Sequence, residues 1–234
     1  MKLLVVSSNM YNEIHQLEEW FHFVKQIADG GILIVDTGSK DGTIEYATKQ
    51  GAIVIIDDII IREGYGPARN HLRMESRKHF PNAHWMIYLD ADERIDAKEF
   101  HRLRFIKDYL RETFDVVALP RIDWMDKERT AMAKDWTIFP DWQARMTRLN
   151  SPMRYVRKLH EQIVDFRGIY TNLRTPKINH FHRSASRDKR DYIGRVCAKL
   201  HMEDSEYGET YPMHHKEQFY RDQLEKEGLG GPEK

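Results

Sequence analysis

The chain has 234 residues, of which 41% are apolar, and this is enough for one domain with a substantial core. Lysine plus arginine and aspartate plus glutamate both number 37, so net charge gives no overall attraction to nucleic acid or membrane. The single cysteine, Cys197, excludes a disulfide framework, and no apolar run reaches the length of a bilayer-spanning helix. The first residues read as a strand and not as a signal peptide, so we expect a cytoplasmic protein.

The first half of the sequence alternates strand and helix signals. Apolar runs predict five strands, in chain order Leu3–Ser7, Ile32–Val35, Ala52–Ile56, Trp85–Leu89 and Val116–Leu119. Apolar residues at helical spacing predict four helices between them, through Leu17–Val24, around Ile44 and Ala47, near Ala68–Arg77 and over Ala97–Arg111. Apolar strands between amphipathic helices predict an α/β fold with a mostly parallel sheet and helices on both faces.

The second half is less regular. Short strands are expected on either side of His160-Glu161, where apolar residues flank the pair. Two helices are expected near the C-terminus, over Ser186–Asp204 and near Met213–Glu227. Residues 186–234 are therefore expected to form a helical C-terminal extension.

Three polar segments follow predicted strands of the first half. They are Ser7–Glu13, Asp36–Asp41 and Asp90–Glu93. In a mostly parallel sheet, ligands bind beyond the carboxyl ends of the strands. The architecture therefore predicts that these three segments meet at one site.

Asp90-Ala91-Asp92 has the strongest chemical signal of the three. Two carboxylates directly after an apolar strand can meet a divalent cation and a diphosphate together, because Mg²⁺ and Mn²⁺ prefer oxygen ligands. Such a metal would neutralise charge on a leaving diphosphate. The same letters also arise by chance at an acidic helix start, so position after a strand is what favours a metal site.

Two further segments carry polar residues toward the same edge. Asp36 ends its strand, where a carboxylate can accept from a base N–H or a ribose hydroxyl. The residues after it form a glycine-containing turn, and either Asp41 or Thr43 can cap the next helix. Arg69 lies in the first turn of the third helix, where it is either a phosphate or base contact or an ordinary surface arginine.

Taken together, these motifs resemble glycosyltransferase family 2, whose members have the GT-A fold. The order and spacing match over four segments, which are Asn12-Glu13, Val35–Thr43, Ala68-Arg69-Asn70 and Leu89–Glu93. The resemblance continues in the second half into Gln143-Ala144-Arg145 and His160-Glu161-Gln162. The resemblance covers roughly Leu3 to His182. It implies residues 1–119 as a nucleotide-sugar-binding half and 120–185 as the acceptor and catalytic half of the same domain, and the expected extension over 186–234 lies outside it.

The resemblance implies inverting transfer of a sugar from a nucleotide-sugar, with UDP favoured as the nucleotide. Carried onto this chain, the nucleotide-binding residues would be Ser8, Asn9, Met10, Asn12, Asp36, Arg69, Asp90 and Ala91. Many members have Asp-Asp-Gly-Ser where this chain has Asp36-Thr37-Gly38-Ser39. The base contact, and with it the identity of the nucleotide, therefore stays open.

The resemblance also implies a metal and a catalytic base. Asp92 and Asp90 would bind Mn²⁺ or Mg²⁺, and His180 would complete the shell. His182 shares the strand-like spacing of His180, and His160 is a weaker candidate, but a structural role for each histidine is an alternative. An inverting transfer needs a base to take the acceptor proton. Glu161 is the first candidate and Asp141 the second, although Glu161 could instead be a structural carboxylate paired with an arginine.

The acceptor is the least determined part. Trp124, Trp136 and Trp142 could stack on a sugar or base, although core packing explains at least one of them. Residues 154–199 contain 12 lysines and arginines against 4 acidic residues, which keeps anionic acceptors such as DNA among the candidates beside glycans. Two other classes fit the pattern, a nucleotidyltransferase and a non-catalytic nucleotide-sugar-binding module. The segment Ser7–Glu13 has no glycine or lysine, which disfavours the nucleotidyltransferase.

Overall fold

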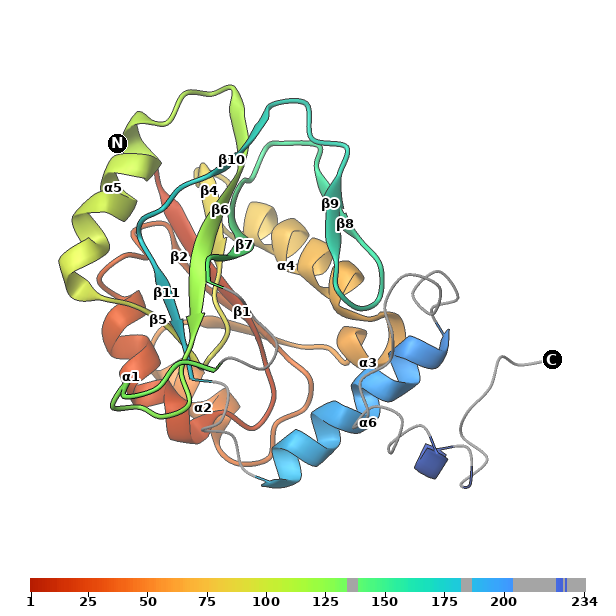
Figure 1. The fold of residues 1–234 in the computed structure, drawn as a ribbon. Helices are drawn as coiled ribbons and strands as arrows, with labels where there is room; N and C mark the ends of the chain where they lie inside the picture. Colours follow the sequence, from red (N-terminus) through yellow and green to blue (C-terminus); the bar gives the residue numbers. More distant parts are fainter. Residues whose placement is uncertain (134–138, 182–186, 204–221, 225, 227–234) are drawn as a thin grey trace.

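A nine-stranded mixed sheet forms the centre of the molecule, with helices on both of its faces (Figure 1). The structure is a computed structural model, and it describes residues 1–133, 139–181, 187–203, 222–224 and 226. The strands are β1 (Leu4–Met10), β2 (Gly31–Asp36), β3 (Ile53–Ile56), β4 (Trp85–Tyr88), β5 (Glu93–Ile95), β6 (Phe114–Asp123), β7 (Asp141–Arg148), β8 (Arg154–Val156), β9 (Gln162–Val164), β10 (Ile169–Asn172) and β11 (Ile178–His180). The helices are α1 (Ile14–Val24), α2 (Thr43–Lys49), α3 (Ile59–Glu63), α4 (Tyr65–His79), the short 3₁₀ helix η1 (Ala97–Glu99), α5 (Phe100–Tyr109) and α6 (Arg187–Glu203).

The strand order is β3-β2-β1-β4-β7-β6-β11-β5, with β10 beside β6. Strands β1 to β4 are parallel to one another, whereas β7 runs antiparallel between β4 and β6. A separate hairpin joins β8 and β9. Five of the eight strand pairings in the main sheet are parallel, so the predicted mostly parallel sheet is confirmed.

Two hydrophobic clusters cover the two faces of the sheet. Adjacent residues of a strand point to opposite faces, and Val6 accordingly packs with α1 and α5 while Val5 packs with α3 and α4. Trp20 on α1 and Leu72 on α4 are fully buried, one on each side. Helices on both faces therefore follow from strands that are apolar on both sides, as predicted.

The helix expected near Ala68–Arg77 begins earlier, at Tyr65, and includes Gly66 and Pro67 in its first turn. Its first amides donate to the segment before β9, Tyr65 N to Lys158 O at 2.7 Å and Gly66 N to Arg157 O at 3.1 Å. Helix starts need such outside acceptors. A Cβ on Gly66 would lie 2.3 Å from the Arg157 oxygen, so glycine permits this contact. Gly66 is therefore a packing residue.

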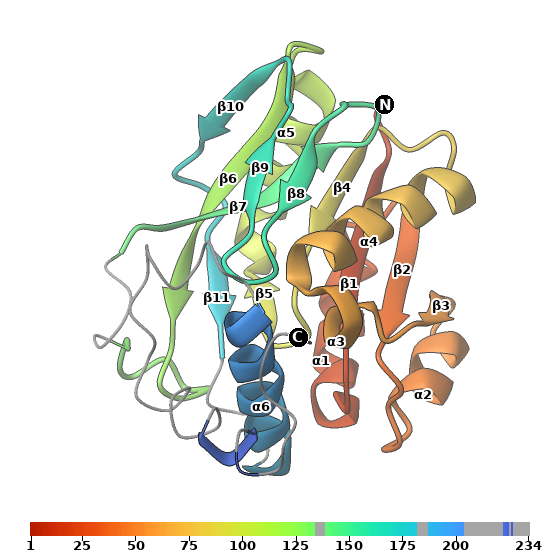
Figure 2. The same cartoon turned by 90° about the vertical axis from the view of Figure 1, so that its right-hand side faces the viewer.

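Helix α6 confirms the helix predicted over Ser186–Asp204 and lies at the edge of the sheet where β1, β2 and β6 end, passing α3 (Figure 2). The helix expected near Met213–Glu227 falls outside the described residues except for residues 222–224 and 226, which are helical. His182 and Trp136 also fall outside them.

None of the helices in the described part of the chain has the length and apolar character needed to cross a membrane.

Candidate active site

The Asp90-Ala91-Asp92 loop joins β4 to β5 and is held by hydrogen bonds to each of its carbonyl groups. The Trp20 indole donates to Asp90 O at 3.1 Å, and the Arg94 guanidinium donates to Ala91 O at 2.6 Å. The Phe181 amide donates to Asp92 O at 2.9 Å. Donors from α1, β5 and the end of β11 therefore fix the backbone that presents the two carboxylates.

The Asp90 carboxylate lies in a network with Tyr88, Glu93 and Arg145. The Tyr88 hydroxyl donates to Asp90 Oδ1 at 2.6 Å, and Arg145 Nη2 donates to Asp90 Oδ2 at 3.1 Å. Arg145 also pairs with the fully buried Glu93. Burial raises the pKa of Glu93, and the charge of Arg145 offsets only part of this rise. Burial lowers the pKa of Arg145, but the charges of Glu93 and Asp90 outweigh burial, so the pKa of Arg145 is raised as well. The network orients Asp90 toward the site.

Asp92, His180 and Asp123 form a chain across three strand ends. His180 Nε2 lies 3.4 Å from Asp92 Oδ2, and His180 Nδ1 bonds with Asp123 Oδ1. The register of β11 causes this, because His180 pairs with Glu93 of β5 on one side and with Asp123 of β6 on the other. Burial lowers the pKa of His180, but the Asp92 charge and the Asp123 hydrogen bond outweigh it and raise the value to about 10.

These side chains fit a divalent cation in their chemistry. A carboxylate and a neutral imidazole can both bind Mn²⁺, so His180 would release its proton on binding the cation, and the carboxylate on the second imidazole nitrogen is a common support for a ligating histidine. Within the described ranges no three His, Cys, Asp or Glu side chains converge on one metal position. The arrangement therefore suits a cation that completes its shell with substrate phosphate and water.

The end of β1 and the loop that follows it place polar atoms beside the two aspartates. Asn9 and Met10 line a cavity there, together with Glu13, while Ser8 is buried and donates to Asn9 O. The side-chain amide of Asn9 and Glu13 Oε2 are buried without a hydrogen-bond partner among the described residues. Buried polar atoms of this kind need a partner, and a ligand in the cavity would supply one.

Asn12 and Asp36 have their oxygens committed to the loops. Asp36 accepts from Gly38 N, Ser39 N and Ser39 Oγ at 2.9, 2.6 and 2.7 Å. Asn12 N donates to Ser39 Oγ at 2.7 Å, and Asn12 Oδ1 accepts from Lys40 N at 2.9 Å. Thr37, and not Asp36, lines the cavity. The hydrogen bonds of Asn12 join the loop between β1 and α1 to the loop between β2 and α2.

The capping expectation for α2 needs a correction. Gly42, with φ of 96°, is the residue before the helix, and Thr43 is its first helical residue. Asp41 Oδ1 accepts from Thr43 N at 3.0 Å, and Asp41 Oδ2 accepts from Ile14 N at 3.0 Å. A positive φ favours glycine, so Gly42 occupies the position directly before the helix. Asp41 therefore accepts from the first helical amide from one residue before that position.

Arg69 and Glu161 form an ion pair in a second cavity. The Arg69 guanidinium lies over the Tyr88 ring at 4.3 Å and the Tyr155 ring at 5.4 Å. Both charged side chains are nearly buried, with 12% and 11% of their side-chain surface exposed. Glu161 is therefore paired with an arginine, which was the structural alternative for this residue. The role of Glu161 as a catalytic base stays a prediction. Arg69 lines this second cavity and is not among the residues that line the first.

Asp141, the other candidate base, lies at the start of β7 and is bound by Arg121 at 2.9 Å and by Gln143 Nε2 at 2.8 Å. It does not line either cavity, whereas the neighbouring Trp142 lines the second. Trp124 donates from Nε1 to Asn179 Oδ1 at 2.9 Å and lines neither. His160 also lines the second cavity.

The two cavities adjoin and share Tyr65 and Asp90. The first, of about 200 Å³, contains Asp92 and His180, and we call it the small cavity. The second, of about 730 Å³, contains Glu161 and is more open, and we call it the large cavity. Asp90 therefore stands where the two cavities meet.

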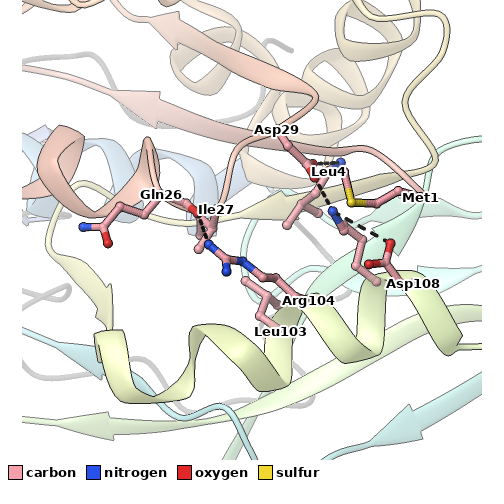
Figure 3. A pocket seen from close by; sticks show the side chains of 9 residues that line it. Met1, Leu4, Gln26, Ile27, Asp29, Leu103, Arg104 and Asp108 are labelled. Atoms are coloured by element: carbon pink, nitrogen blue, oxygen red, sulfur yellow. Dashed lines mark hydrogen bonds and ion pairs between the residues drawn. The ribbon is translucent and has the colours of Figure 1, made fainter.

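A third cavity lies at the opposite edge of the sheet, near the beginning of β1 (Figure 3). It has a volume of about 280 Å³. Asp29 accepts there from Leu4 N at 2.8 Å and pairs with Lys107 of α5. Its charged groups satisfy one another, and it contains none of the predicted site residues.

Several residues of the site were not predicted from the sequence. Arg145 and Glu13 both lie in motifs that match the family, but the sequence assigned no role to either residue. Asp123 was missed because the strand containing it was expected to end at Leu119, whereas β6 continues to Asp123. Tyr88 and Lys189 carried no signal, since the contacts of each depend on partners distant in the chain.

Solved structures share this architecture. S. aureus TarS matches with a TM-score of 0.52 and 14% identity, over 99% of this chain and 44% of that chain. A mycobacterial protein matches with a TM-score of 0.51 and 12% identity, over 86% and 73%. Mannosyltransferase PcManGT from Pyrobaculum calidifontis, in complex with GDP-Man and Mn²⁺, matches with a TM-score of 0.50 and 10% identity, over 86% and 63%.

The fold is thus that of the GT-A glycosyltransferases, as the sequence resemblance implied. This chain spans less than half the length of TarS. The family model for glycosyl transferase family 2 matches residues 9–183, and the chain belongs to that family. A search among curated proteins returns no match.

Proposed function

We propose that this protein is a metal-dependent inverting glycosyltransferase that moves a sugar from a nucleotide-sugar, with UDP favoured, to an acceptor hydroxyl. The observation that carries the proposal is the cluster of Asp92, His180 and Asp90 in the small cavity, with Asp90 at the point where this cavity meets the large one. PcManGT is described in complex with GDP-Man and Mn²⁺, which supports a similar donor and metal here.

The small cavity is assigned to the nucleotide and diphosphate. Asp92 and His180 would hold Mn²⁺ or Mg²⁺, with His180 oriented by Asp123. When bound, the cation would neutralise charge on the leaving diphosphate. Asn9 would offer its buried amide to the nucleotide, and Tyr88 and Arg145 would keep Asp90 in place beside the sugar.

The large cavity is assigned to the acceptor. Glu161 would take the proton from the acceptor hydroxyl as the new bond forms at the anomeric carbon, and Arg69 would hold Glu161 in position. Trp142, Tyr155 and Tyr170 line this space and offer aromatic faces, which favours a carbohydrate acceptor.

A nucleic-acid acceptor has less support. Arg154 pairs with Asp165, Lys158 with Glu203 and Lys189 with Glu13, so part of the basic stretch is neutralised locally. DNA binding with many phosphate contacts would weaken steeply with salt. A steep salt dependence of binding to a DNA duplex would restore this alternative, and weak binding that does not change with salt would remove it.

The base assignment is tested by comparing Glu161→Gln with Asp141→Asn. Each change keeps the shape of the side chain and removes its ability to accept a proton. We expect Glu161→Gln to lower kcat by about 100-fold or more while nucleotide binding stays within about twofold, because general bases contribute 10²–10⁴-fold. Turnover is measured with UDP-, GDP- and dTDP-sugars in the presence of Mn²⁺. If Asp141→Asn loses kcat and Glu161→Gln does not, the base is Asp141.

A further inference from the structure

Helix α6 lies outside the segment that the family model matches, which ends at residue 183. It nevertheless forms one wall of the small cavity through Lys189, Tyr192, Ile193 and Val196. Figure 2 shows the helix at the carboxyl edge of the sheet, next to α3, which it also contacts. A segment outside the matched domain therefore completes the space assigned to the donor.

Contacts at both ends hold α6 over the cavity. The Tyr192 ring stacks on Tyr11 with centroids 4.0 Å apart and planes at 23°. Lys189 pairs with Glu13 in the same loop, and both side chains are more than nine-tenths buried. At the far end Glu203 pairs with Lys158 at 2.8 Å. The position of Lys189 is thus set by aromatic stacking and by ion pairs on both sides of the cavity.

A diphosphate in the small cavity would need positively charged groups beside it, because most of the charged side chains there are carboxylates. Three carboxylates line it, from Glu13, Asp90 and Asp92, and they would repel a diphosphate. Among the described residues that line it, Lys189 is the only lysine or arginine. It belongs to α6, whereas Asp92 and His180 lie at strand ends, so the cavity has charged groups from both the helix and the sheet.

We propose that Lys189 is a diphosphate-binding residue of the donor site, delivered by α6. This inference rests on the proposed function. An ammonium group has three N–H donors, so Lys189 can keep its ion pair with Glu13 and donate to a phosphate oxygen as well. Tyr192 acts as the anchor that keeps α6, and therefore Lys189, in register with the β1–α1 loop.

The test is calorimetric binding of UDP and GDP, and of uridine and guanosine, in the presence of Mn²⁺. We expect Lys189→Ala to weaken binding of the diphosphate by about tenfold or more, because a charge-assisted hydrogen bond is lost. Binding of the nucleoside stays within about twofold. Lys189→Arg retains most of the diphosphate affinity, and Lys189→Gln, which can still donate to Glu13, loses it as Lys189→Ala does. Lys199→Ala, on the same helix and 41% exposed, is the matched control and binds like the unsubstituted chain.

Two results would overturn the inference alone. One is equal diphosphate affinity in the unsubstituted chain and in Lys189→Gln. The other is an equal loss for nucleoside and diphosphate, which would mean that Lys189 only holds the helix. If the unsubstituted chain binds neither UDP nor GDP, the proposed function falls together with the inference. Should Lys189→Ala fail to fold, the comparison rests on Lys189→Gln and Lys189→Arg.

Discussion

At the residue scale, the site is built from side chains that each have two partners. His180 lies between Asp92 and Asp123, and Arg145 lies between Asp90 and Glu93. Paired groups of opposite charge can be buried at a lower cost than single ones. The site therefore exists as a connected set, and a change in one member tests the others.

Asp92→Asn is expected to remove most metal-dependent turnover. The amide is a weaker ligand than the carboxylate, and the loss of charge stabilisation on the diphosphate lowers kcat by about 100-fold or more. The measurement is turnover against Mn²⁺ concentration. Asp165→Asn is the matched control, because Asp165 is exposed and has φ of 59°, which asparagine tolerates. Nearly normal turnover of Asp92→Asn across the titration would exclude Asp92 from the metal shell.

Glu13 gives a prediction for pH. Burial raises the pKa of Glu13 from its ordinary value of 4.5 to about 7, against the opposing charge of Lys189. Between these pH values the folded chain binds more protons at Glu13 than the unfolded chain, so its contribution to stability, complete below pH 4.5, is lost as pH rises through 7. The loss is roughly 3 kcal/mol.

Glu13→Gln is expected to flatten the fall in the free energy of unfolding between pH 4.5 and 7. Urea unfolding at a series of pH values measures it. Glu45→Gln, in the first turn of α2, serves as the comparison and should leave the slope as it is. An unchanged slope in Glu13→Gln would mean that Glu13 does not titrate in this range.

At the element scale, α1 has two functions, since Trp20 fills the core and its indole nitrogen holds the Asp90 carbonyl. The helix was predicted from its apolar stripe alone. Its bond to the loop after β4 was not predictable, because a buried tryptophan gives no signal about the direction of its N–H group.

Trp20→Phe is expected to lower kcat as well as stability. The ring stays in the core, but the Asp90 loop loses one of its anchors, and stability falls by about 1 kcal/mol for the hydrogen bond. Trp85→Phe is the matched control, because Trp85 is also fully buried and donates to Lys107 O at 3.2 Å, away from the site. We expect a similar stability loss in both and a lower kcat in Trp20→Phe only. Equal kcat values would show that this anchor has no catalytic effect.

At the scale of the whole molecule, the sheet positions all three polar segments, because each of them lies at the carboxyl end of one of its strands. Its central strands are buried on both sides, so its stability depends on packing against helices of both faces. The edge strand β3 contributes much less, since Ile56 at its end is 66% exposed.

Leu33→Ala in β2 is expected to lower the free energy of unfolding by about 2–5 kcal/mol, because a fully buried leucine leaves a cavity on truncation. Ile56→Ala on the neighbouring strand should change it by less than about 0.5 kcal/mol. Urea unfolding of both variants gives the comparison. Similar losses in the two would mean that the edge of the sheet is as well packed as its centre.

The sequence by itself determined most of the order of strands and helices in the first half, without α3 and β5, together with the two-sided burial of the sheet and the polar segments at the strand ends. The spacing of apolar residues and the length of apolar runs depend only on neighbouring residues in the chain, and they show directly which side chains are buried. Only the tertiary structure decided which side chains meet: the pairing of Arg69 with Glu161, the position of His180 between two aspartates, and the pairing of Lys189 with Glu13, 176 positions apart. The physical reason is that periodicity shows which face of an element is buried but does not name the partner. Partners depend on strand register and on the antiparallel insertion of β7, which are properties of the whole sheet.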